Sequence, residues 1–257
     1  MTPHFTDHCT ILKGLVGSTV HGLNLEGSDD RDEMGICVEP LSEVITLGGS
    51  FEQFIFRTAA ERTGIKDARS EAGDLDLTIF SLRKFCKLAA SGNPTVLLMF
   101  YTPELVVETP IGRELRDMAP YFASKEAGAR FLGYMHGQRL RLLGEKGQKR
   151  VKRPELEEKY GYDTKYAMHV LRLGFQGLEF LDTGKLTLPM QGSQKNYLMG
   201  VRQGQETLEA VISMAETLET DLKKALEKSP LPEHPNRPLI ESFMQQVYLE
   251  QWSKTVQ

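Results

Sequence analysis

The sequence predicts an α+β fold, with a mixed sheet and flanking helices in its first part and helices in its C-terminal part. Short apolar runs of strand length occur early in the chain, at Ile11–Val16 and Ile36–Val38. Asp74–Ile79 alternates polar and apolar residues, as a half-buried strand does. Beyond about Pro110 the apolar residues follow helical spacing instead. This change of pattern predicts that strands and helices are segregated along the chain.

Boundary signals place the helices. Ser81 can cap a helix over Leu82–Ala90, and Gly92–Pro94 ends that helix and opens another. Further helices are predicted at 131–143, 163–184, 205–228 and 239–252. The prediction is therefore a first domain of residues 1–115 followed by a helical domain of residues 116–257.

Composition excludes several classes of protein. The chain has 257 residues, of which 40% are hydrophobic and 26% charged, as is usual for a globular protein. A net charge of −4 predicts no strong nonspecific binding to nucleic acid. Three cysteines without metal-type spacing indicate buried thiols in a reducing compartment. Because no leader pattern and no membrane-spanning apolar stretch are found, we expect a cytoplasmic protein without a membrane partner.

A Gly-Ser turn and a pair of carboxylates follow one another near the N-terminus. Gly17 and Ser18 come directly after an apolar run, and their backbone amides and hydroxyl can contact phosphate. Asp30 and Asp32 stand two residues apart before the next apolar run, so on an extended segment their side chains share a face. This order predicts metal-assisted chemistry on a nucleoside triphosphate.

The carboxylates predict a magnesium site. Two anionic groups side by side repel each other unless a cation lies between them, and Mg²⁺ accepts carboxylate, water and phosphate oxygens. A two-metal site requires a further carboxylate, for which Asp76, between Leu75 and Leu77, is the best candidate. We therefore expect a two-metal Mg²⁺ site, with Mn²⁺ as an alternative ion.

Together these motifs resemble the polymerase-beta-type nucleotidyltransferase superfamily. The segments that carry the resemblance to its bacterial and phage branch, the RNA-ligase-associated polymerase-like predicted nucleotidyltransferases, are Gly17–Leu23, Ser28–Gly35, Ser81–Pro94 and Gly161–Leu173. The resemblance covers about residues 10–190. It implies a polymerase-beta-like palm for residues 1–115 as the catalytic domain.

The resemblance also implies metal ligation by Asp30, Asp32 and Asp76, and triphosphate contact by Gly17 and Ser18. This sequence departs from the family pattern in two ways. Asp29 precedes the pair and is an alternative to Asp30 as its first member, although only Asp30 shares a face with Asp32. Some relatives carry an acidic residue shortly after the Asn-Pro, where Leu98 stands here, so the role of that carboxylate is absent.

Basic side chains outside these motifs are candidates for phosphate contact. Lys165, His169 and Arg172 fall on one face of a predicted helix, which suits the wall of a cleft that meets triphosphate or pyrophosphate. A solvated face is the alternative for this stripe. Lys84 can reach phosphate or be a surface lysine like its neighbours. Lys146–Arg153 is the one basic run that suits a nucleic-acid backbone, and the alternative there is a solvated connection.

These observations predict a Mg²⁺-dependent nucleotidyltransferase of EC 2.7.7 type. It would transfer a nucleoside monophosphate from an NTP to a hydroxyl group, on RNA such as tRNA or a repair intermediate, and release pyrophosphate. Two alternatives remain open: transfer to a protein or small molecule, as in toxins of this superfamily, and a noncatalytic module that binds nucleotide or RNA. Base preference and oligomeric state are not predicted.

Overall fold

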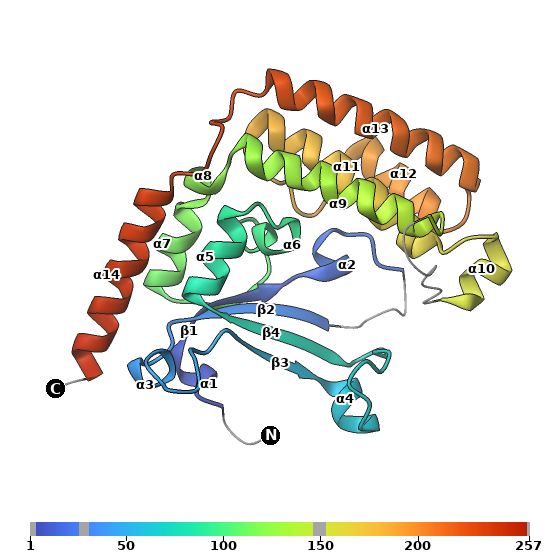
Figure 1. Ribbon diagram of the computed structural model, residues 1–257. Helices are drawn as coiled ribbons and strands as arrows, with labels where there is room; N and C mark the ends of the chain where they lie inside the picture. Colours follow the sequence, from blue (N-terminus) through green and yellow to red (C-terminus); the bar gives the residue numbers. More distant parts are fainter. Residues whose placement is uncertain (1–3, 26–30, 146–152, 256–257) are drawn as a thin grey trace. The chain divides into compact units, whose positions relative to one another are not determined.

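The computed structural model describes residues 4–25, 31–145 and 153–255 (Figure 1). Contacts between Cα atoms divide the chain into two compact units. The α/β unit consists of Met1–Ala90, Thr95–Phe122 and Asn236–Gln257, and the helical unit consists of Ser91–Pro94 and Ala123–Pro235.

A five-stranded mixed sheet forms the centre of the α/β unit, with strand order β3-β4-β2-β1-β5 (Figure 1). The strands are β1 (Thr10–Leu15), β2 (Arg31–Cys37), β3 (Gln53–Arg57), β4 (Leu75–Ser81) and β5 (Leu105–Glu108). Only β2 and β4 run parallel, while the other neighbours are antiparallel. The predicted strands at 11–16 and 74–79 are confirmed, whereas the one at 36–38 is the end of a longer strand that begins at Arg31. The parallel pair sets equivalent residues of β2 and β4 side by side.

Short helices and one long C-terminal helix surround this sheet. They are α1 (Thr6–Cys9), α2 (Gly17–Val20), α3 (Leu41–Val44), α4 (Thr58–Thr63), α5 (Leu82–Ala90), α6 (Pro94–Leu97), a 3₁₀ turn at Leu98–Phe100, α7 (Pro110–Asp117), α8 (Ala119–Phe122) and α14 (Arg237–Thr255). The predicted cap is present, since Ser81 Oγ accepts a hydrogen bond from Lys84 N at 3.1 Å. Leu82, Phe85 and Ala89 of α5 are fully buried and join the core with Leu12 and Ile36 of the sheet.

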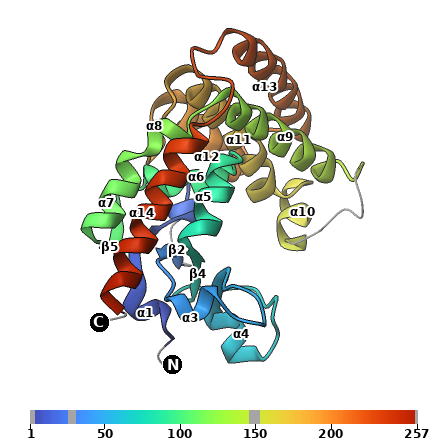
Figure 2. The same ribbon diagram turned by 60° about the vertical axis from the view of Figure 1, so that its left-hand side comes forward.

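The last helix groups with the α/β unit, which differs from the predicted domain of residues 116–257. Contacts join α14 to α5 and α8, and Figure 2 shows α14 beside α5. Tyr248 donates a hydrogen bond to Glu39 Oε1 at 2.9 Å, and Trp252 Nε1 donates to the carbonyl of Glu39 at 3.0 Å. The apolar stripe of an amphipathic helix shows that one face is buried, but not which unit buries it.

The helical unit is built around α11 (Thr164–Thr183), which contacts the four other helices of the unit. The remaining helices are α9 (Lys125–Leu142), α10 (Pro154–Tyr160), α12 (Gly192–Arg202) and α13 (Leu208–Lys228). Asp163 caps α11 by accepting a hydrogen bond from Tyr166 N at 2.9 Å. Gly177 lets helices approach closely, because a Cβ there would lie 2.8 Å from Leu222 Cδ2.

Elements that were not predicted from the sequence include β5, α4, α10 and α12. The four residues of β5 pair with β1 at the edge of the sheet and are too few for an alternation pattern to stand out. Within the described residues, no helix is both long enough and apolar enough to cross a membrane.

Candidate active site

Two of the three predicted aspartates lie side by side in the sheet. Asp32 is the second residue of β2 and Asp76 the second residue of β4, and the parallel register pairs them directly. Residues in register on neighbouring strands point to the same face, and the strands lie about 4.8 Å apart. The structure thus brings together two carboxylates that are far apart in the sequence. Asp30, and the alternative Asp29, lie outside the described residues.

The Gly-Ser turn contacts the first of these carboxylates. Gly17 has a φ of +74°, a conformation that favours glycine, and a Cβ added to it would lie 2.0 Å from Asp32 Oδ2. The turn is also tied to the strand, since Val16 N donates a hydrogen bond to the carbonyl of Asp32 at 2.9 Å. Gly17 and Ser18 are the first two residues of α2, so the structure places both beside Asp32.

A basic residue and a hydroxyl hold the second carboxylate. Arg57 is in register with Asp76 on the neighbouring strand β3, and its Nη2 lies 3.1 Å from Asp76 Oδ2. Ser70 Oγ lies 3.0 Å from each carboxylate oxygen of Asp76. The hydrogen bond and the charge of Asp76 raise the pKa of Arg57, although burial opposes this. Sequence reasoning missed both partners, because Arg57 reaches Asp76 only through strand pairing and Ser70 through an irregular loop.

The loop that carries Ser70 is fixed by a second carboxylate. Asp74 accepts hydrogen bonds from Arg62 Nη1 at 2.8 Å, Arg62 Nη2 at 3.1 Å and Glu71 N at 2.8 Å. The backbone donor of Glu71 first, and then Arg62, lower the pKa of Asp74. The carbonyl of Asp74 also accepts a hydrogen bond from Arg31 N at 2.9 Å, at the start of β2. Asp74 therefore has a structural role next to the two aspartates in register.

Lys84 does not lie beside the two aspartates in register, and its contact with phosphate stays a prediction. Asp76 lies at the start of β4, whereas Lys84 follows the end of that strand. Five strand residues from Asp76 to Ser81 span about 16 Å. The Lys84 ammonium instead forms an ion pair with Glu52 at 3.2 Å. Lys84 lies in the first turn of α5, at the other end of β4 from Asp76.

Lys165, His169 and Arg172 share a face of α11 in the helical unit, as predicted from their spacing. Arg172 Nη2 and His169 Nδ1 lie 2.7 Å apart. Burial, and secondarily the charge of Arg172, lower the pKa of His169 to about 3, so the imidazole is neutral and accepts this hydrogen bond. Burial also lowers the pKa of Arg172 to about 10. Their contact with phosphate stays a prediction.

Most of the predicted basic run Lys146–Arg153 lies outside the described residues. Arg153 is described, and its Nη1 forms an ion pair with Asp163 Oδ2 at 3.2 Å. The same carboxylate group caps α11 through its other oxygen. Arg153 is therefore bound to its own helical unit.

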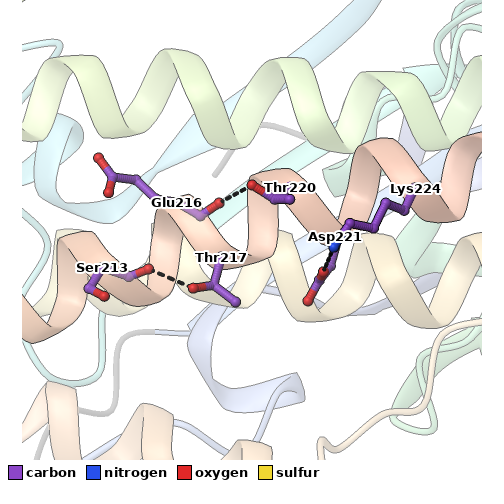
Figure 3. A pocket seen from close by; sticks show the side chains of 6 residues that line it. All are labelled: Ser213, Glu216, Thr217, Thr220, Asp221 and Lys224. Carbon is purple, nitrogen blue, oxygen red and sulfur yellow. Dashed lines mark hydrogen bonds and ion pairs between the residues drawn. The ribbon is translucent and has the colours of Figure 1, made fainter.

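A hollow of about 320 Å³ lies elsewhere, along the exposed face of α13 (Figure 3). The residues that line it are Ser213, Glu216, Thr217, Thr220, Asp221 and Lys224. Most of them bond within the helix, since Thr217 Oγ1 donates to the carbonyl of Ser213 and Lys224 pairs with Asp221 at 3.2 Å, while Glu216 is paired with Arg139 of α9 at 3.4 Å. Polar groups on a single helix face, bonded to their own helix or to α9, do not converge on a ligand as a binding pocket requires.

The aspartate pair fits a divalent cation. The donors are carboxylate oxygens, which Mg²⁺ and Mn²⁺ prefer, and the missing Cβ of Gly17 leaves space directly beside Asp32 Oδ2. Arg57 already pairs with Asp76, so it would compete with an ion at this carboxylate. Among the described residues no cluster of three or more candidate ligands is found, and Asp30, the third predicted ligand, is not among them.

An α+β unit that sets two aspartates in register beside a Gly-Ser turn resembles the nucleotidyltransferases of polymerase-beta type. The comparison with family models agrees: the chain belongs to the RNA repair pathway DNA polymerase beta family, whose model matches residues 4–247. Membership in this family supports nucleotidyl transfer as the general activity.

Individual relatives are more distant. A 38.9 kDa protein of Enterobacteria phage T4, described as uncharacterized and encoded in the nrdC-mobD intergenic region, is 29% identical over 133 residues. The match spans 50% of this chain and 37% of that relative, so the chain covers little more than a third of its length. A nucleotidyltransferase-like protein of Exiguobacterium sibiricum has a TM-score of 0.31 and 10% identity, over 86% of this chain and 69% of its own. That likeness is too weak to support an argument.

Proposed function

We propose that this protein is a Mg²⁺-dependent nucleotidyltransferase that moves a nucleoside monophosphate from an NTP to a hydroxyl group and releases pyrophosphate. The observation that carries the proposal is the direct register of Asp32 and Asp76, with Gly17 against the Asp32 carboxylate. A protein that only bound nucleotide would gain nothing from two adjacent carboxylates, which repel each other. Asp30 is assigned as the third ligand from the sequence pattern.

The chain's own residues have distinct roles in this proposal. Asp32 and Asp76 present their oxygens from neighbouring strands and so fix the direction from which the acceptor hydroxyl approaches the α-phosphorus. Gly17 and Ser18 offer backbone amides and a hydroxyl to the phosphate chain beside Asp32. The chemistry that Mg²⁺, or Mn²⁺ in its place, supplies when bound is a lower pKa for the attacking hydroxyl and charge neutralisation of the triphosphate.

The covalent step is an in-line displacement. The hydroxyl oxygen forms a bond to the α-phosphorus while the bond to the bridging oxygen of the β-phosphate breaks, and the hydroxyl proton passes to solvent. Pyrophosphate leaves with the electron pair of the broken bond. The nucleoside monophosphate remains on the acceptor as a phosphodiester.

RNA is the acceptor that we propose, either tRNA or an RNA repair intermediate. The description of the family, which names an RNA repair pathway, supports this assignment. The net charge of −4 favours an acceptor held at a local site rather than by a broad basic surface. Labelling of a protein or a small molecule is the competing outcome.

The test is incubation of the purified chain with each α-³²P-labelled NTP, Mg²⁺ and, in separate reactions, total RNA, a protein extract and a small-molecule pool. We expect label in RNA with one or more NTPs, and none with Asp32→Asn or Asp76→Asn. The Asp117→Asn variant, which changes an exposed carboxylate on α7, is the control and should label normally. Label in protein alone would mean that the acceptor is a protein and not RNA. Binding of NTP without any labelled product would mean that the protein is a noncatalytic module.

A further inference from the structure

Arg172 on α11 carries a positive charge that no carboxylate of the described residues balances. Its only hydrogen-bond partner among the described residues is His169, which is neutral. Its Nε is shielded from solvent and has no hydrogen-bond partner. No ion pair with Arg172 is found in the described parts of the chain. A guanidinium has five N–H donors in a rigid fork, so most of this fork is free.

A second arginine of the same unit shows how a similar group is usually satisfied. Arg139 on α9 is 14% exposed, and its Nε lies 2.8 Å from Glu219 Oε1. Its Nη1 also lies 3.4 Å from Glu216 Oε1. Shielding an ionised group from water is costly unless it is paired, and Arg139 follows this rule. Arg172 does not follow it among the described residues, which leaves its guanidinium available to an anion that is not part of the described chain.

Arg202 is a weaker candidate for the same role. Its Nη1 is also shielded and without a partner, but the charge of Asp163 acts on it. Arg202 is therefore partly compensated within the chain, whereas burial alone lowers the pKa of Arg172.

We propose that Arg172, oriented by His169, is a binding site on the helical unit for the polyphosphate of a nucleotide, either the NTP or the released pyrophosphate. The planar fork of arginine matches phosphate oxygens and forms charge-assisted hydrogen bonds. His169 keeps the guanidinium in place by accepting from Nη2 and, being neutral, does not add a competing cation. The choice of polyphosphate rests on the proposed nucleotidyl transfer, in which NTP and pyrophosphate are the reacting anions.

Binding is tested on the full chain by isothermal titration with inorganic pyrophosphate and, separately, with ATP, both in EDTA. Without divalent ions the aspartates repel phosphate, so this condition isolates the arginine site. Arg172→Met should weaken pyrophosphate binding by roughly tenfold to a hundredfold, the range for a hydrogen bond to a charged group. Arg130→Met, which removes an exposed arginine of α9, is the matched control and should bind as the wild type does.

Thermal unfolding without ligand separates a binding role from a structural one. If Arg172 binds an anion and does not stabilise the fold, Arg172→Met removes an unbalanced charge and should leave the melting temperature unchanged or raise it. Arg139→Met should lower the melting temperature, because it leaves the largely buried Glu219 carboxylate with only the longer contact to His136 at 3.4 Å. Arg172→Lys is a second variant, which keeps the charge but loses the fork, and should bind pyrophosphate more weakly than the wild type.

Three results would overturn the inference: equal pyrophosphate affinity in wild type and Arg172→Met, no binding of either anion by the wild type, or a loss of melting temperature in Arg172→Met as large as in Arg139→Met. Binding of a 5′-phosphorylated oligonucleotide in place of pyrophosphate and ATP would also overturn the assignment of the ligand. Asp32→Asn should keep metal-free pyrophosphate binding. Failure of nucleotidyl transfer with this binding intact would therefore count against the proposed function and not against the arginine site.

Discussion

Two arginines, one in each unit, are held in opposite ways. In the α/β unit Arg57 lies 3.1 Å from Asp76 and is matched by a carboxylate across a strand pair. In the helical unit Arg172 has a neutral histidine as its partner and no carboxylate among the described residues. The first arrangement pairs a cation of the chain with one of the two carboxylates in register. The second leaves a guanidinium without a carboxylate among the described residues. We infer that the α/β unit attracts cations and the helical unit attracts an anion.

Removal of either carboxylate in register tests whether the α/β unit binds the cation that the reaction needs. Asp76→Asn and Asp32→Asn should each lower the rate of nucleotidyl transfer by at least about a hundredfold. Losses of that size already follow when groups that hydrogen-bond metal ligands are removed. Single-turnover assays with labelled NTP measure this effect. Each variant should retain its far-ultraviolet circular dichroism, and wild-type rates in either one would remove that aspartate from the site.

The close approach of Gly17 to Asp32 gives the next largest effect. Gly17→Ala would put a Cβ 2.0 Å from Asp32 Oδ2 and would also strain a φ of +74°. Gly64→Ala is a matched control, since Gly64 has a φ of +69° and nothing lies within 4 Å of its added Cβ.

Chemical denaturation should show a loss of about 1 kcal/mol for Gly64→Ala, which has backbone strain alone. Gly17→Ala should lose more stability and also lose transfer activity. If the two variants behave alike, the contact between turn and carboxylate has no role in the site.

Replacement of Arg57 tests how far this arginine limits the affinity of Asp76 for a divalent cation. Arg57→Ala frees the Asp76 carboxylate from its internal cation, so Mn²⁺ should bind a few-fold more tightly, in line with the modest energy of a partly exposed ion pair. Electron paramagnetic resonance of free Mn²⁺ measures the affinity. Arg113→Ala, which removes an exposed arginine paired with Glu108, should leave it unchanged. Weaker Mn²⁺ binding in Arg57→Ala would mean that Arg57 orients Asp76 rather than competing for it.

His169 gives a smaller, pH-dependent effect in the helical unit. Its pKa is lowered from 6.5 to about 3, so between these values the unfolded chain binds a proton that the folded chain does not. The stability that the neutral imidazole contributes is present above about pH 6.5 and is lost as the pH falls toward 3. Denaturation from pH 7 to 4 should therefore show a shallower loss of stability for His169→Gln than for the wild type. Identical slopes would mean that His169 titrates normally.

The sequence is a good guide to residues that share a local pattern. Asp32 and Asp76 each open an apolar strand, and the turn at Gly17 follows another, so the pattern alone indicates where they lie on their elements. Arg57 could not be found in this way, because its contact with Asp76 depends on the antiparallel register of β3 and β4. Lys84 lies at the other end of β4 from Asp76, because proximity in sequence does not account for the length of the strand between them.

Burial is the other property that the sequence does not reveal. The spacing of His169 and Arg172 predicts a shared helix face, but a solvated face has the same spacing. Only the structure shows that Arg172 Nε is shielded from solvent and unpartnered. In the same way, the pattern of 239–252 predicts a helix without indicating that it joins the α/β unit.

The central claim, that Asp32 and Asp76 bind the same divalent ion, is tested most directly by a double-mutant cycle on Mn²⁺ affinity. Wild type, Asp32→Asn, Asp76→Asn and the double variant are titrated under one set of conditions by electron paramagnetic resonance. The account predicts that the double variant binds Mn²⁺ little more weakly than either single variant, because losing one ligand already disrupts the shared ion. Independent, additive losses, or unchanged affinity in either single variant, would contradict it.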